Sequence, residues 1–199
     1  MIALPRRFYQ RPATEVAPDL LGKLMVHETE LGLRIGRIVE VEAYLGREDL
    51  AAHSSKGVTP RTQVMFGEAG HAYVYLIYGM HHCMNVVTGP RGSGSAVLLR
   101  ALEPVQGLEL NTSGPGRLAK AMGIDKRQYG SDLCADHSAL YLADDGHEPM
   151  ALRTSARIGV HYAGEWADKP LRYYIEGSPW VSRAPGLKAG LRAQASKKM

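Results

Sequence analysis

The chain has 199 residues, of which 45% are hydrophobic and 22% charged, and its formal net charge is +4. It is expected to be one intracellular domain with a substantial core. Its two cysteines, Cys83 and Cys134, make no disulfide framework, and no apolar run approaches the roughly 20 residues of a membrane span. A disulfide-rich secreted fold and a transmembrane helix are therefore excluded, while the small positive excess weakly favours a polyanionic partner.

The first half of the chain predicts a short helix and then a β-hairpin. Residues 14–22 have a helical pattern that ends at Gly22, and residues 24–27 and 33–44 predict two strands around a turn. Residues 46–70 are polar, charged and glycine-containing. A long irregular segment of this kind inside a compact domain is usually functional or mobile.

The second half predicts several strands and one helix. The order of elements predicts an α+β fold, a single domain over residues 1–185 with a mixed, mostly antiparallel β-sheet and surrounding helices. Residues 186–199 are rich in lysine, arginine, alanine and serine and are expected to form a weakly ordered basic tail. The strands are expected at 72–78, 83–87, 95–102, 138–142, 156–162 and 170–176, and the helix at 117–123.

The segment from Arg37 to Gly46 carries two glutamates on a predicted strand. Valine and isoleucine dominate it, and the period of two places Glu40, Glu42 and Tyr44 on one face. Carboxylates on a face of a buried strand are costly unless they are paired or take part in chemistry. This segment alone leaves two hypotheses open, an edge strand with solvated glutamates or a catalytic general acid or base.

Three tyrosines fall within six positions of the predicted strand 72–78. Alternation places Tyr73 and Tyr75 on one face, and Tyr78 falls at a turn beside Gly79. Tyrosines in a concave site can sandwich a planar ring, especially a cationic one, and an aromatic residue at an exposed hairpin tip is a typical wedge between bases. The alternative is that these tyrosines pack the core.

Two further motifs carry less specific signals. His81, His82 and Cys83 invite a zinc hypothesis, but adjacent strand residues point to opposite faces and no spacing matches a zinc pattern, so no metal site is expected. Residues 113–117, Ser-Gly-Pro-Gly-Arg, lack the P-loop signature. They either bind a phosphate at a helix N-terminus or simply begin an ordinary capped helix.

Together these segments resemble the alkyladenine (3-methyladenine) DNA glycosylase family. The resemblance spans about residues 7–182 and rests on several motifs in the same order. These motifs are residues 37–44 (RIVEVEAY), 51–54 (AAHS), 73–80 (YVYLIYGM), 83–85 (CMN), 97–104 (VLLRALEP), 114–118 (GPGRL), 157–160 (RIGV), 170–175 (PLRYYI) and 177–181 (GSPWV).

The resemblance implies roles for individual residues at the reacting centre. Glu42 matches the general base that deprotonates the attacking water, and Arg100 and the backbone carbonyl of Ile158 match groups that help to hold this water. Beside these implied roles, Glu40 is expected to have a supporting role, either as a partner for an arginine or as a modest perturber of a neighbouring pKa. The residues implied to surround the flipped base are Tyr44, His53 and Tyr75, with Tyr73 beside them, and Asn85, which would crowd the 2-amino group of guanine.

The resemblance also implies how the protein meets DNA. Tyr78 matches the side chain inserted into the gap left by the extruded nucleotide, with Met80 in the same hairpin. Relatives often carry aromatic residues after Met80, whereas this chain has His81 and His82, which is a local departure. The further positions expected to approach DNA are Arg61, Met65, Gly116 and Arg117.

The function implied is a monofunctional DNA glycosylase. It would flip damaged purines of the 3-methyladenine, 7-methylguanine, hypoxanthine and ethenoadenine class out of double-stranded DNA and hydrolyse the N-glycosidic bond with a Glu-activated water, leaving an abasic site. A monomer without cofactor, metal or membrane contact is expected, located with the genomic DNA, with a curved sheet like that of the C-terminal domain of formyltransferases.

Two other classes of function remain as alternatives. One is a non-catalytic nucleic-acid-binding domain that uses the tyrosines as a stacking platform. The other is a carbohydrate glycosidase built on Glu40 and Glu42, which is disfavoured because the usual carboxylate pair flanks the scissile bond, whereas these two approach it from the same side.

Overall fold

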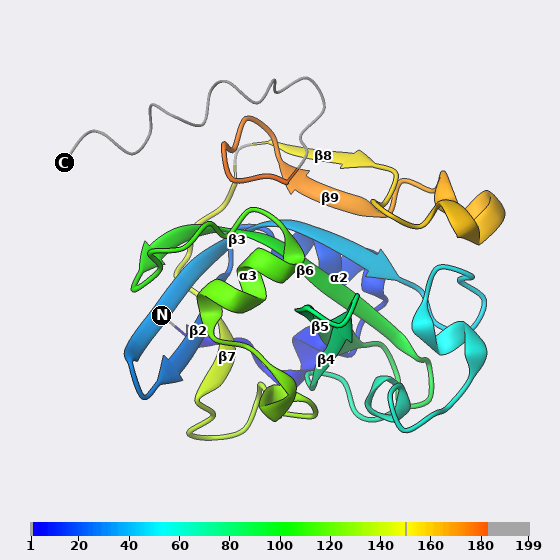
Figure 1. The fold of residues 1–199 in the computed structure, drawn as a ribbon, viewed down its shortest axis with the longest axis horizontal. Coiled ribbons are helices and arrows are strands. Elements are labelled where there is room, and N and C mark those ends of the chain that lie inside the picture. Colours follow the sequence, from blue (N-terminus) through cyan, green and yellow to red (C-terminus); the bar gives the residue numbers. More distant parts are fainter. Residues whose placement is uncertain (1, 150, 183–199) are drawn as a thin grey trace.

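A single nine-stranded β-sheet organises the computed structural model, which describes residues 2–149 and 151–182 (Figure 1). The strand order is β1-β7-β2-β3-β6-β5-β4, with β9 paired to β3 and β8 paired to β9. Every pairing among the described strands is antiparallel. The predicted α+β fold with a mostly antiparallel sheet is thereby confirmed, while the predicted tail at 186–199 lies outside the described residues.

The strands follow the predicted order along the chain, with additional short elements at the N-terminus and at β8. The hairpin of β2 and β3 turns at residues 30–31, and the hairpin of β4 and β5 turns at residues 78–80. The strands are β1 (Ile2–Ala3), β2 (Leu24–Thr29), β3 (Gly32–Tyr44), β4 (Ala72–Ile77), β5 (His81–Thr88), β6 (Ser95–Gln106), β7 (Leu140–Asp144), β8 (Leu152–Ser155) and β9 (Arg172–Ile175).

Three α-helices accompany the described strands: α1 (Arg6–Tyr9), α2 (Ala13–Leu20) and α3 (Pro115–Met122). Helix α2 packs on β3 and β6, and α3, which lies in front of the strands in Figure 1, packs on β5 and β6. The apolar faces of both helices join the main core, so each helix is held by burial of its stripe against the sheet. None of the described helices is long and apolar enough to span a membrane.

The predicted strand at 156–162 is wrong. Strand β8 ends at Ser155, the next residues are irregular, and a 3₁₀ helix follows at His161–Ala167. Gly159 has a φ of +81°, outside the strand region, and the side chain of Arg157 is drawn into a buried ion pair. Both features keep this segment out of the sheet.

The second half of β3 is an interior strand. Residues Glu40 to Glu42 pair with β6 on one side and with β9 on the other. The register between β3 and β6 shifts twice here, so that Val39 of β3 and Arg100 of β6 have no opposite residue in this strand pair. Such bulges re-aim side chains and are typical of strands beside active sites. The hypothesis of an edge strand with solvated glutamates is therefore wrong.

The segment between β3 and β4 is largely irregular, as expected, and begins at Gly46. It contains two 3₁₀ helices, His53–Lys56 and Gln63–Phe66. Gly46 has a φ of +98°, and a Cβ atom there would clash with the carbonyl oxygen of Ser93. Only glycine fits this turn, because both its backbone conformation and the space around it exclude a side chain.

Replacing Gly46 by alanine is expected to destabilise the protein by about 3 kcal/mol, since it adds a steric clash to the cost of a left-handed alanine. The matched control is Gly57→Ala, because Gly57 has a similar φ of +84° but open space around it. The control carries the backbone strain without the clash and is expected to cost about 1–2 kcal/mol. Denaturant unfolding of both variants measures the difference, and equal losses would contradict the role assigned to the Ser93 contact.

Candidate active site

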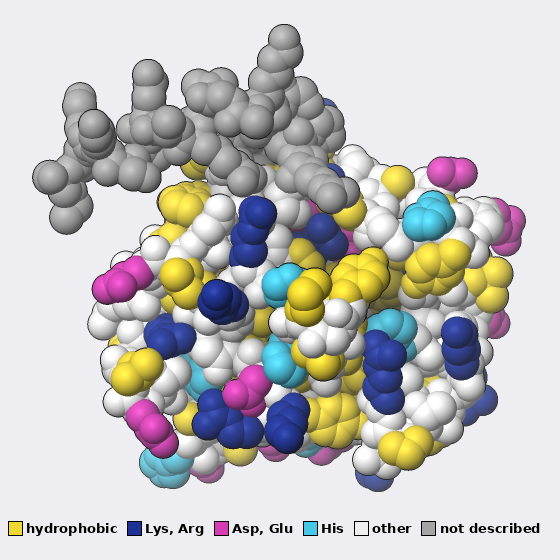
Figure 2. Space-filling model, viewed as in Figure 1, with side chains coloured by type: hydrophobic (Ala, Val, Ile, Leu, Met, Phe, Trp, Pro, Cys, Tyr) yellow, Lys and Arg dark blue, Asp and Glu magenta, His cyan; other side chains and the backbone are white. Residues whose placement is uncertain are grey.

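A cavity of about 750 Å³ opens beside the β4–β5 hairpin and the N-terminus of α3. Figure 2 shows lysine and arginine side chains spread over the face that carries this hairpin, with hydrophobic side chains and histidines near its centre. Segments far apart in the chain contribute to the lining. The predicted site residues that line the cavity are Tyr44, His53, Met65, Tyr73, Tyr75, Tyr78, Asn85, Arg100, Gly116, Arg117 and Ile158.

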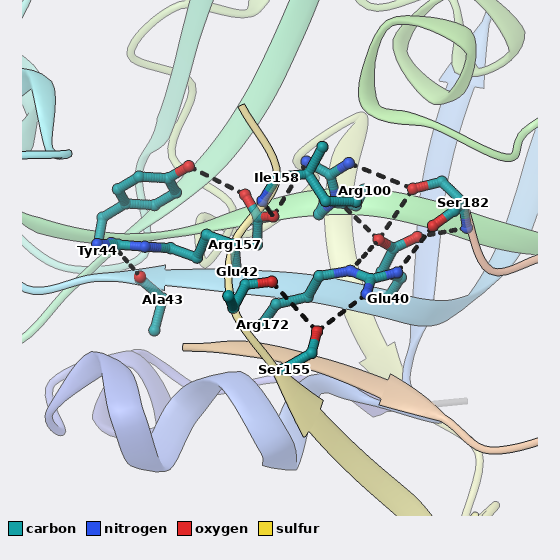
Figure 3. A network of polar contacts seen from close by, with 11 residues as sticks. Glu40, Glu42, Ala43, Tyr44, Arg100, Ser155, Arg157, Ile158, Arg172 and Ser182 are labelled. Carbon is teal, nitrogen blue, oxygen red and sulfur yellow. Dashed lines mark hydrogen bonds and ion pairs between the residues drawn. The ribbon is translucent and has the colours of Figure 1, made fainter. Parts of the chain in front are cut away.

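Glu42 lies beneath this cavity, with its side chain fully buried. Its Oε1 accepts a hydrogen bond of 2.7 Å from the N–H of Ile158, and its Oε2 accepts one of 3.0 Å from the hydroxyl of Tyr44 (Figure 3). The Nη1 of Arg100 lies 3.3 Å from Oε1. All three partners line the cavity, so they connect the carboxylate to it. The sequence assigned the backbone carbonyl of Ile158 to holding the attacking water, whereas the contact with Glu42 is made by its N–H.

Tyr44 is held as a donor to Glu42 by its surroundings. Burial raises the pKa of the Tyr44 phenol well above its ordinary value, and the negative charge of Glu42 adds to this effect. The phenol therefore stays protonated at neutral pH and donates to the carboxylate. One residue thus combines two functions, since its ring forms a cavity wall while its hydroxyl orients Glu42.

Glu40 is buried in the same cluster as Glu42, because Arg100 contacts both carboxylates. Its Oε1 accepts hydrogen bonds from the Nε atoms of Arg100, at 2.8 Å, and Arg172, at 2.7 Å, and its Oε2 accepts one of 2.6 Å from the N–H of Ser182. The expected partnership with an arginine is confirmed. Because Glu40 is fully buried and its oxygens are engaged, it has no role as a second catalytic carboxylate, which removes the basis of the carbohydrate glycosidase hypothesis.

Aromatic side chains form the wall of the cavity opposite the β3 residues. The ring of His53 meets that of Tyr75 edge-on at a centroid distance of 4.6 Å, and its Nδ1 lies 2.8 Å from the hydroxyl of Tyr73. Asn85 donates from Nδ2 to the carbonyl of Tyr73 at 3.1 Å, which fixes its amide. Tyr73 is also packed in a buried cluster, so the core-packing hypothesis and the cavity-wall hypothesis both hold for it.

The tip of the β4–β5 hairpin projects from the rim of the cavity. Tyr78 is 84% exposed and Met80 is 72% exposed. Tyr78 adopts a φ of +52° and Gly79 one of +67°, and the N–H of Met80 donates to the carbonyl of Ile77. A non-glycine residue with positive φ at an exposed tip is strained, so this tip keeps a large aromatic side chain presented to solvent at a conformational cost.

Two predicted DNA contacts lie at the borders of the cavity. Arg61 places its guanidinium 5.0 Å from the centroid of the Tyr75 ring and lines a neighbouring groove rather than the cavity itself. Gly116 packs closely against His81, since a Cβ atom on it would lie 2.9 Å from the Cβ of His81. The hairpin tip and the start of α3 therefore meet at this rim, next to Arg117.

Neither metal chemistry nor a cysteine nucleophile has a visible site in the described part of the chain. No group of three or more histidine, cysteine or acidic side chains lies close enough together there to hold a metal ion. Cys83 lines the cavity, but burial raises the pKa of its thiol, which keeps it protonated and unreactive.

Several residues of the site carried no individual prediction. Arg172 and Ser182 hold Glu40, and Asp49 pairs with Arg157 behind Tyr44. Tyr162, 63% exposed, also lines the cavity. Arg157 and Arg172 fall inside the motifs of the family resemblance, and this position could have marked them as site residues. Nothing in the local pattern around Asp49 or Ser182 distinguishes them from solvated residues.

The environment of His53 predicts a specific dependence of stability on pH. Burial, together with the nearby cations Arg61 and Lys56, lowers the pKa of His53 to about 4, whereas an unfolded histidine titrates near 6.5. As the pH falls from 6.5 to 4, the unfolded chain therefore takes up a proton that the folded protein does not, and the folded state loses stability. Between pH 7 and pH 4.5 we expect wild type to lose about 2 kcal/mol more than His53→Gln.

Denaturant unfolding at the two pH values measures this difference. The control is His161→Gln, which alters an exposed ring and is expected to retain the pH dependence of wild type. Equal losses for wild type and His53→Gln would contradict a neutral His53 in the folded cavity.

Comparison with known proteins identifies the family. Residues 7–179 match the methylpurine-DNA glycosylase family. A "Putative 3-methyladenine DNA glycosylase" of Legionella pneumophila (strain Lens) is 56% identical over 184 residues, covering 92% of this chain and all of the relative. A protein with the same name from Myxococcus xanthus is 54% identical and covers 92% of this chain and 94% of its own length. Another from Methanocella arvoryzae is 50% identical and covers 94% of this chain and 99% of its own length. The chain therefore belongs to the methylpurine-DNA glycosylase family and is a DNA glycosylase, a hydrolase of base excision repair.

Proposed function

We propose that this protein flips damaged purines out of double-stranded DNA and hydrolyses their N-glycosidic bond with a water molecule activated by Glu42, leaving an abasic site. The substrates are alkylated and deaminated purines of the 3-methyladenine, 7-methylguanine, hypoxanthine and ethenoadenine class. The observation that carries the proposal is a buried carboxylate, held by Ile158, Tyr44 and Arg100, directly beneath a cavity with aromatic walls.

The contacts of Glu42 favour the role of a general base. An ionised carboxylate offers about four acceptor positions, and the N–H of Ile158, the hydroxyl of Tyr44 and the guanidinium of Arg100 occupy three of them. One position remains for a water molecule at the floor of the cavity. The three partners hold the carboxylate in a fixed orientation, in which it can accept the proton of this water.

The same carboxylate supports the departure of the base. Cleavage at C1′ passes through a transition state with oxocarbenium character, so a negative charge nearby is stabilising. Arg100 balances Glu42 in the resting site and is itself shared with Glu40, which limits its pull on the catalytic carboxylate. Water attack alone completes the reaction, which needs neither a metal nor an organic cofactor.

The aromatic walls supply selectivity for damaged purines. The rings of Tyr44, Tyr75 and His53 can contact a purine by stacking or edge-on. The π faces of the tyrosines attract cationic N-alkylated bases. Such cationic bases are also good leaving groups. Asn85, held by Tyr73, limits the space for the 2-amino group of normal guanine. Neutral lesions such as hypoxanthine depend more on contacts with the cavity walls and on protonation of the base.

Base extrusion is assigned to the hairpin tip, and DNA affinity to the surrounding cations. Tyr78 and Met80 are the most exposed apolar side chains beside the cavity, and insertion of such a wedge offsets the few kcal/mol that flipping costs. Arg117 at the rim and Arg61 in the adjoining groove are placed to meet phosphates, which gives affinity without sequence preference. One protein molecule as a monomer suffices for one lesion.

Replacing Glu42 by glutamine tests the chemical step. We expect single-turnover release of 7-methylguanine or hypoxanthine from a duplex to fall at least about a hundredfold, because an amide cannot accept the proton of the attacking water. Binding of the lesion duplex should persist. The matched control is Glu103→Gln, an exposed glutamate on β6, which should leave release unchanged.

The outcome separates the possible functions. Full base release by Glu42→Gln would contradict the role of Glu42. Binding without base release by wild type would instead favour the non-catalytic stacking platform.

Replacing Tyr78 by serine tests the wedge. Affinity for a lesion-containing duplex is expected to drop about tenfold, because the unstacked gap loses its filling, while the salt dependence of binding to undamaged DNA stays the same. Leu31→Ser is the matched control, since Leu31 is a similarly exposed apolar residue at the tip of the β2–β3 hairpin. Equal effects of both substitutions on lesion affinity would contradict the wedge assignment.

A further inference from the structure

A second buried ion pair lies behind the cavity, between Asp49 and Arg157. Both side chains are fully buried, and the guanidinium binds the carboxylate through two nitrogens, at 2.5 and 2.8 Å. The pair joins the loop after β3 to the irregular segment after β8, which are 108 residues apart in the chain. A buried ion pair contributes little to stability compared with apolar packing, so its presence here calls for another explanation.

Arg157 donates to the carbonyl of Trp166 at 3.2 Å, and the other side-chain contacts of this pair with the backbone lie beside the site. Arg157 donates to the carbonyl of Ala43 at 2.9 Å, the residue between Glu42 and Tyr44. Asp49 accepts from the N–H groups of Leu45 and Ala51, each at 3.0 Å. Ile158, whose N–H binds Glu42, directly follows Arg157. The pair therefore positions the residues on either side of the catalytic carboxylate.

The pair also places charge next to the base-binding surface. The guanidinium carbon of Arg157 lies 4.7 Å from the centroid of the Tyr44 ring. Tyr44 lines the cavity and Arg157 does not, so the ring separates the cation from the cavity. A purine stacked on Tyr44 would have this guanidinium behind the same ring, in surroundings where charges are poorly screened. The carboxylate of Asp49 cancels most of its field.

We propose that Asp49 and Arg157 are positioning residues that also determine specificity, because their mutual neutralisation keeps the Tyr44 side of the cavity acceptable to cationic bases. The proposal rests on the proposed function. Without Asp49, the uncompensated charge of Arg157 would repel a cationic alkylated purine through the Tyr44 ring, whereas a neutral purine would be affected far less. The pair thus sets the balance between alkylated and deaminated substrates.

The test compares two substrates in the same enzyme preparation. Single-turnover release is measured from one duplex with 7-methylguanine, which is cationic, and from one with hypoxanthine, which is neutral. The readout is the ratio of the two rates. A purely structural defect lowers the active fraction for both substrates alike, so it does not move this ratio.

The expected changes in the ratio have definite signs. Asp49→Asn should lower the ratio of 7-methylguanine to hypoxanthine release roughly three- to tenfold, the size expected of one poorly screened charge at this range. Arg157→Gln should leave the ratio equal to or above that of wild type, because Asp49 keeps its N–H donors. The double variant should restore the wild-type ratio within about twofold, since the pair is again neutral.

Two control variants sharpen the comparison. Arg157→Lys keeps the charge but loses the two-pronged contact, so both rates should fall while the ratio stays near that of wild type. Arg153→Gln breaks the exposed ion pair with Glu176 on the β8–β9 hairpin and should change neither rate nor ratio.

Two results would overturn the proposal while leaving the proposed function intact. One is an unchanged ratio in Asp49→Asn, and the other is a double variant in which the ratio remains low. Failure of wild type to release either base would overturn the proposed function, and this inference with it.

Discussion

The guanidinium of Arg100 reaches two buried carboxylates, Glu40 and Glu42, and the rest of the site depends on this contact. Together with Arg172 it balances their charges deep in the sheet. Ions in such a place are tolerated only when they are paired and hydrogen-bonded, and removing one partner of a buried pair typically costs 3–5 kcal/mol. Loss of any one of these side chains would leave an unpaired buried charge, and Glu42, the proposed general base, is held by the same contacts that allow it to be buried.

The sheet and the irregular segments contribute differently to this site. Glu42, Tyr44 and Tyr75 stand on strands, where pairing with neighbouring strands fixes their backbone. Ile158 and His53 stand outside the strands, where backbone hydrogen bonds alone would leave them loose. Buried polar contacts take the place of the ladder there, and the same contacts bring charge close to the cavity. Buried polar contacts in the irregular segments thus fix positions that strand pairing fixes in the sheet.

Local patterns in the sequence predicted most of the fold, because alternation, helix ends and glycine turns depend on near neighbours along the chain. The strand around Glu42 and the exposed position of Tyr78 follow from such patterns. The position of Arg100 does not, because it results from two register shifts between β3 and β6 that no local signal marks. The error at residues 156–162 has the same origin, since a partner 108 residues away in the chain draws Arg157 out of any strand.

The acidic members of the two buried clusters, Glu40, Glu42 and Asp49, lie within ten residues of one another, while their arginine partners lie 58 to 132 residues further along the chain. Contacts of this sequence separation close late in folding, because the loop entropy is lost before they form. The proposed hydrolytic site therefore carries a larger loop-closure cost than the β2–β3 and β4–β5 hairpins, which close over two or three residues. Local opening of the chain from β8 to β9 would withdraw Arg157, Ile158 and Arg172 from the site together, without breaking the pairing of β3 with β6.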